Sequence, residues 1–85
     1  MPHYRFQIDD GAGYDAGVIT HLPSLGDAKL EAARAIGEIA HMDTARFLAA
    51  ERCSIRVSDG AGLILFEVMV LVTNSPALKS PKSQD

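Results

Sequence analysis

The four-letter stretch DGAG occurs twice, at Asp10–Gly13 and at Asp59–Gly62, each time after a run of alternating apolar residues. Glycine-rich loops bind phosphate when the backbone N–H groups of a following helix point at the anion. Neither copy is followed by a helical pattern, and the aspartates around the first copy would repel a phosphate. We therefore interpret both copies as turns between strands, where Asp and Gly tolerate the backbone conformations of a hairpin.

The first of these loops is the better candidate for a small-ligand site. It covers about nine residues, Asp9–Gly17, which is longer than a hairpin needs. It contains Asp9, Asp10 and Asp15, whose carboxylates suit a hard cation such as calcium, although the spacing of an EF-hand is absent. These three aspartates are the candidate metal ligands. Their alternative role is to accept hydrogen bonds from local backbone N–H groups.

Four other side chains could take part in chemistry: His3, His21, His41 and Cys53. In a hairpin centred on residue 13, His3 and His21 would approach each other, but no histidine pair has the helical spacing of a zinc site. Cys53 alternates in phase with apolar residues, which predicts a buried thiol and not a nucleophile. The chain contains no Ser-His-Asp grouping. We expect no catalytic residues, no enzymatic activity and no cofactor.

The composition sets limits on the class of protein. With 85 residues and 47% apolar content, the chain is expected to form one globular domain. The net charge is -3, and the five arginines are scattered, which argues against nucleic acid as a partner. The single cysteine excludes an intramolecular disulfide and favours a reducing compartment. The N-terminal residues lack the pattern of a signal peptide, and Glu67 interrupts the longest apolar run, so we expect a soluble, cytoplasmic protein with no membrane contact.

The period of the apolar residues predicts four strands. Clean alternation over residues 3–9 indicates a half-buried strand, and the short second strand, 18–22, ends at Pro23. Alternation returns over residues 52–58, with Cys53, Ile55 and Val57 facing one way. A long apolar strand, residues 63–73, follows the second DGAG.

A helix is predicted between the second and third strands. Asp27 is the better N-cap of the available polar residues because a run of good helix formers begins directly after it. We expect this helix to continue to about Ala45 or beyond; in the alternative, Asp43 caps a second short helix. Its apolar stripe consists of Leu25, Ala28, Ala32, Ala35, Ile36, Ile39 and Met42. The small alanines of the stripe predict a helix lying close to a sheet.

The fold class that follows is α+β: a four-stranded antiparallel sheet, in the order strand-strand-helix-strand-strand, with one amphipathic helix packed on one face. The domain is expected to span residues 1–73. Residues 74–85, rich in proline and serine, are predicted to form a disordered C-terminal tail.

The last strand is the main functional signal. It is apolar on both faces except at Glu67, which predicts a central strand or one covered on both sides. Because one helix covers only one face, we expect the other apolar row to be covered by a second copy. A homodimer is therefore predicted, by sheet face or by edge pairing, with Phe66, Val68 and Val70 as interface candidates on the uncovered face. A protein or peptide partner is the related possibility, and the alternative is that residues 45–51 cover that face.

Several short motifs occur in the same order as in a known family. These are Met-Pro-x-Tyr-x-Phe at the N-terminus, an Asp-Gly turn at Asp10, Leu22-Pro23 before an Ala-rich helix, and an Asp-Gly turn at Asp59 before the last strand. Together, over about residues 2–72, they resemble a family of small bacterial proteins, common in rhizobia, that is classified as a domain of unknown function. The resemblance implies a compact α+β fold and supplies no catalytic residues.

Overall fold

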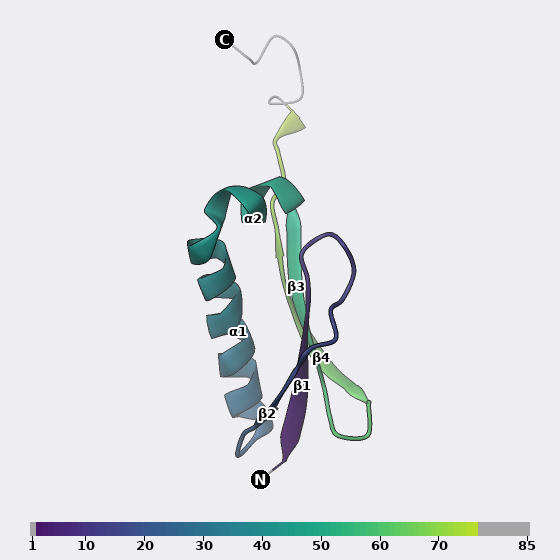
Figure 1. The fold of residues 1–85 in the computed structure, drawn as a ribbon. Helices are drawn as coiled ribbons and strands as arrows, with labels where there is room; N and C mark the ends of the chain where they lie inside the picture. The colour runs from purple at the N-terminus through teal and green to yellow at the C-terminus, as the bar shows by residue number, and fades with distance from the viewer. Residues whose placement is uncertain (1, 77–85) are drawn as a thin grey trace.

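The computed structural model describes residues 2–76. Its elements are β1 (His3–Asp9), β2 (Val18–His21), α1 (Leu25–Met42), α2 (Thr44–Ala50), β3 (Arg52–Ser58) and β4 (Ile64–Leu71). The strands form one antiparallel sheet in the order β2-β1-β3-β4, with α1 along one face and α2 near the start of β3 (Figure 1). The α+β prediction is confirmed, with two helices in place of one. Residues 77–85 of the predicted tail lie outside the described residues.

The strand register defines two faces of the sheet, because residues directly opposite each other on antiparallel strands share a face. On the face covered by α1, called the core face here, Ile55 lies opposite Ile8 on one side and Val68 on the other. On the other face, called the open face, Arg56 lies opposite Gln7 and Glu67. The alternation predicted for β1 and β3 is therefore confirmed.

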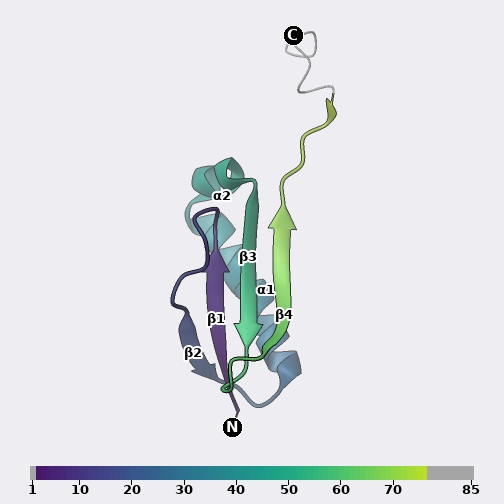
Figure 2. The ribbon, with the colours of Figure 1, turned by 90° about the vertical axis from the view of Figure 1, so that its right-hand side faces the viewer.

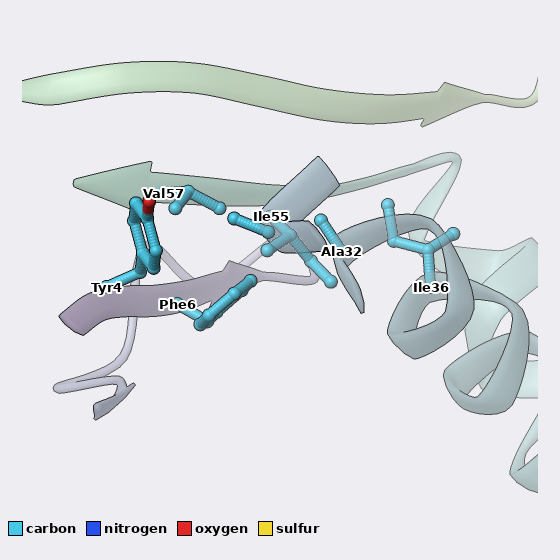
Figure 3. Packing of buried hydrophobic residues seen from close by; sticks show 7 residues of the cluster. Tyr4, Phe6, Ala32, Ile36, Ile55 and Val57 are labelled. Carbon is cyan, nitrogen blue, oxygen red and sulfur yellow. The ribbon is translucent and has the colours of Figure 1, made fainter. Parts of the chain in front are cut away.

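The hydrophobic core lies between α1 and the three strands β1, β3 and β4. Its fully or almost fully buried members are Tyr4, Phe6, Ala28, Ala32, Ile36, Ile55 and Val57 (Figure 3). Ala28 and Ala32 have no exposed surface, so the helix lies as close to the sheet as the alanine pattern predicts. The two ends of the predicted stripe do not take part: Leu25 and Met42 are 42% and 82% exposed. They lie at the first and last positions of α1, beyond the part of the helix that the sheet covers.

The start of α1 corrects the predicted cap. Ser24, and not Asp27, is the N-cap: its Oγ accepts a hydrogen bond from the backbone N–H of Asp27 at 3.2 Å. The same hydroxyl donates to Oδ2 of Asp27 at 2.8 Å. Asp27 therefore occupies the third helical position, where an acidic side chain is favoured by the helix dipole.

The prediction of one continuous helix to about Ala45 is wrong. The backbone leaves the helical conformation at Asp43, whose N–H still donates to the carbonyl of Ile39. The carboxylate of Asp43 then accepts a hydrogen bond from the N–H of Arg46, so this residue ends α1 and caps α2. Aspartate competes in this way with the backbone bonds of a helix interior. The residues expected in the alternative to cover the second face of the sheet form α2 instead, beside α1 and the start of β3 (Figure 1).

Candidate functional site

β4 forms one edge of the sheet, and the prediction of a central strand is wrong. The tight turn at the second DGAG places β4 beside β3, and the other side of β3 is already paired with β1. Within residues 2–76 no further strand pairs with the outer side of β4 (Figure 2). β4 is eight residues long, twice the length of β2 at the opposite edge. The longer and more apolar of the two edges is therefore free.

The direction of the backbone groups along β4 follows from one hydrogen bond. The N–H of Val72 donates to the carbonyl of Glu51 at 2.7 Å, so the backbone groups of Val72 point toward β3. Because these groups alternate along a strand, those of Val70 and Val68 also point toward β3. The N–H and C=O groups of Glu67, Met69 and Leu71 point outward. They present the hydrogen-bonding pattern that an added strand would pair with.

The side chains of β4 correct the predicted interface in one respect. Phe66, Val68 and Val70 lie opposite Val57, Ile55 and Cys53, and therefore on the core face and not on an uncovered face. They are half-buried and pack against the core cluster. On the open face of this strand, Met69 is 46% exposed and Leu71 is 59% exposed. Ile64, at the hairpin end of the strand, is 54% exposed. Whether Phe66, Val68 and Val70 contact a partner stays a prediction.

β4 carries few of the features that protect an edge strand. Such edges are usually short, charged, interrupted by proline or twisted away by a bulge. β4 has no proline, and its single charged residue is Glu67. The bulge in this pairing lies at the hairpin end, between Val57 and Ser58, and leaves the rest of the strand regular. An apolar and unprotected edge of this length is typical of a surface that pairs with another strand.

In the first hairpin loop, Asp9 acts as a local cap. Its Oδ1 accepts hydrogen bonds from the backbone N–H groups of Gly11 at 2.9 Å and Gly13 at 3.0 Å. The second loop repeats this arrangement: Oδ1 of Asp59 accepts from Ala61 and Leu63, both at 2.9 Å. In both loops the aspartate caps the second and fourth residues after it. The turn interpretation of the two DGAG stretches is therefore supported, although the capping aspartate of the first loop is Asp9 and not Asp10.

The other two aspartates of this loop also have partners. Oδ2 of Asp10 lies 2.8 Å from Nη2 of Arg46 on α2. Oδ1 of Asp15 accepts a hydrogen bond from the N–H of Ile8 at 3.1 Å. Each candidate metal ligand is thus held by a different group. Among residues 2–76, no three or more His, Cys, Asp or Glu side chains are grouped in a way that could hold a metal ion.

The hydrogen bonds to Asp9 predict a pH dependence of stability. The hydrogen bond from Gly11, followed by that from Gly13 and the charges of two arginines, lowers the pKa of Asp9 despite its burial. A lowered pKa in the folded state stabilises the protein above the pKa of the unfolded chain, and this contribution is lost as the pH falls through the folded-state value. We expect Asp9→Asn, which keeps an acceptor oxygen, to reduce the loss of unfolding free energy between about pH 6 and about pH 2.

Urea unfolding of the wild type and Asp9→Asn at a series of pH values measures this difference. Asp9→Ala, which removes the acceptor as well, serves as the control and should be less stable than Asp9→Asn at neutral pH. An identical pH dependence of the unfolding free energy for the wild type and Asp9→Asn would contradict a lowered pKa of Asp9 in the folded protein.

Sequence reasoning missed a cluster on the open face, formed around Tyr14 of the first loop. The Tyr14 hydroxyl donates to Oε2 of Glu67 on β4 and lies 3.4 Å from Oγ of Ser54 on β3. The guanidinium carbon of Arg56 lies 3.8 Å from the centre of the Tyr14 ring. The loop is therefore attached across β1 to the inner strand β3 and the edge strand β4, which accounts for its length. The one local signal was an aromatic residue in a loop of glycines and aspartates.

The predicted approach of two histidines is confirmed. His3 and His21 lie directly opposite each other on β1 and β2, with ring centres 5.4 Å apart. His41 is in the last turn of α1, on another element. Cys53 is 1% exposed, as predicted for a structural thiol, and burial together with the charges of Asp10 and Asp9 raises its pKa. A raised pKa disfavours the reactive thiolate.

One hollow lies between the two helices and the start of β3. It has a volume of about 210 Å³ and is lined mainly by Ile39, Met42, Phe47, Ala50 and Cys53. Binding sites for small organic ligands usually measure about 300–1,000 Å³. This hollow is therefore below the usual size of a ligand site.

These features define a class: a small α+β domain with a four-stranded antiparallel sheet, one helix-covered face and one long free edge. Residues 3–71 match the family described as "Domain of unknown function (DUF6894)", and the chain belongs to this family. The resemblance to a domain of unknown function is thereby confirmed. Searches of curated proteins and of solved structures gave no match. Among residues 2–76, no helix is both long enough and apolar enough to span a membrane.

Proposed function

We propose that this protein is a small, non-enzymatic interaction module that self-associates through the free edge of β4. One observation carries the proposal: an eight-residue edge strand with a single charge and outward-pointing backbone groups at Glu67, Met69 and Leu71. A strand added to such an edge gains backbone hydrogen bonds along its whole length. The single cysteine favours a reducing compartment, so we expect the module to act in the cytoplasm, and the motif resemblance implies a bacterial host.

A second copy of the chain is the partner that best fits this edge. Antiparallel pairing of β4 with β4 of another copy is isologous, so the same surface serves both subunits and the assembly closes as a dimer. The result is a sheet of eight strands in which neither long edge remains free. The short β2, followed by Pro23, forms both ends of this sheet.

The core-face side chains of β4 favour the same arrangement. Phe66, Val68 and Val70 are half-buried in the single chain because α1 packs mainly over β3 and reaches β4 less. A neighbouring β4 would cover their remaining apolar surface. Burial of apolar surface contributes about 25 cal/mol per Å². Phe66, Val68 and Val70 would therefore still be interface residues in an edge-paired dimer.

Light scattering coupled to size-exclusion chromatography tests the proposal over a wide range of protein concentrations. The expected result is twice the monomer mass, with dissociation on dilution. A monomer at every concentration, up to the millimolar range used for NMR, would overturn self-association. In that case, an interaction module of this kind would have to bind an extended peptide of another protein at the free edge of β4.

A further inference from the structure

We infer that the two copies of β4 pair about a two-fold axis that passes through Val68. This inference rests on the proposed self-association and specifies which residues of the two copies meet. Val68 then lies opposite Val68 of the partner subunit, and Glu67 lies opposite Met69 of the partner subunit. Phe66 lies opposite Val70 of the partner subunit.

The alternation of faces along β4 excludes half of the possible registers. Directly opposed residues of an antiparallel pair point to the same face of the sheet. A two-fold axis between two neighbouring residues, such as Glu67 and Val68, would oppose a core-face residue to an open-face residue. Because a shift by one residue exchanges the two faces of a strand, this pairing is excluded. The axis must therefore pass through a residue that lies opposite its own copy.

The length of the overlap favours an axis near the middle of β4. β4 spans Ile64–Leu71, so its midpoint falls between Glu67 and Val68. Placing the axis on either of these residues keeps almost the whole strand paired. An axis farther along in either direction, at Phe66 or Met69, leaves more of both strands without a partner and loses backbone hydrogen bonds.

The charge of Glu67 decides between the two remaining positions of the axis. An axis on Glu67 would place two carboxylates directly opposite each other, and like charges in this position destabilise a sheet. An axis on Val68 separates them and opposes each Glu67 to a methionine. The Glu67 carboxylate also keeps its hydrogen bond from Tyr14 on the open face.

The register also determines the backbone geometry at the axis. The outward groups of Glu67 and Met69 exchange hydrogen bonds across the interface in this register. Val68, whose backbone groups point toward β3, occupies a non-hydrogen-bonded position. Opposed Cα atoms at such positions lie about 4.5 Å apart. This distance falls within the range that a disulfide spans.

Single-cysteine crosslinking tests the register directly. In the background Cys53→Ser, which removes the native thiol, Val68→Cys, Glu67→Cys and Met69→Cys are each oxidised and analysed without reductant. We expect Val68→Cys to form the covalent dimer at least about tenfold faster than either other variant, because only there do the two sulfurs meet at the axis. Circular dichroism checks that each variant is folded.

A second variant tests the same register without a cysteine. Met69→Lys places a lysine opposite Glu67 of the partner subunit twice in each dimer, so the dimer should dissociate less readily at low salt than the wild type. With the axis on Glu67, residue 69 faces Leu65 of the partner subunit, and the lysine should weaken the dimer. A dimer that crosslinks fastest at position 67 or 69, or that is weakened by Met69→Lys, overturns the register alone. A monomeric wild type overturns the proposed function as well.

Discussion

Met69→Pro is expected to produce a folded monomer. Proline lacks the backbone N–H, and the N–H of Met69 points away from β3, so the substitution removes a donor of the free edge and no bond of the sheet. Proline is tolerated at edge positions of this kind. Its ring also occupies the space into which a neighbouring strand must fit. We expect self-association to be lost, as measured by light scattering, with an unchanged far-ultraviolet circular dichroism spectrum.

The neighbouring residue supplies a matched control. The N–H of Val70 points toward β3, so Val70→Pro removes a bond within the sheet and should unfold the protein or lower its stability strongly. Met69→Ala removes the side chain but keeps the N–H, and should remain dimeric with a weaker affinity. A Met69→Pro variant that dimerises like the wild type would contradict pairing along this edge.

Ile55→Ala is expected to destabilise the fold by about 2–5 kcal/mol. Ile55 has no exposed surface and lies at the centre of the core, between Ile8 and Val68 in the sheet and under α1 (Figure 3). Small domains have a total stability of about 5–15 kcal/mol, so this loss is a large part of the whole. Urea unfolding at a fixed protein concentration measures it.

Ile55→Val is the control for this substitution, because it removes one methylene and should cost about 0.5–1.5 kcal/mol. The comparison must be made on the Met69→Pro monomer, since dimerisation adds to the apparent stability of the wild type. A loss below about 1 kcal/mol for Ile55→Ala would contradict the position of this side chain in the core.

The local elements were predictable because they depend on short-range patterns. The period of two over residues 3–9 and 52–58, and the alanines of α1, identified the strands, the helix and their buried sides. The two errors in the helix arose at polar residues. Ser24 and Asp27 can each cap a helix, and Asp43 can either continue a helix or end it. Small differences in hydrogen-bond energy decide which residue caps the helix and where the helix ends. These differences cannot be read from the pattern of residues in one sequence.

The arrangement of the candidate site could not be predicted in the same way. The apolar character of β4 on both faces suggested a central strand, but the strand order depends on the pairing of β1 with β3, which are far apart in the sequence. The cluster of Tyr14 with Glu67 joins residues 53 positions apart and leaves no periodic signal. The apolar sequence of β4 and its edge position in the single chain fit together if β4 is central only in the dimer, where a second copy covers its free side.

Amide hydrogen exchange along β4 tests the central claim most directly. The N–H groups of Val68 and Val70 point into the sheet and should be protected at all protein concentrations. Those of Glu67, Met69 and Leu71 point outward and should exchange rapidly in dilute protein. We predict that these three amides become protected as the concentration rises through the dimer dissociation constant. Rapid exchange at all three in a sample shown to be dimeric would contradict self-association through this edge.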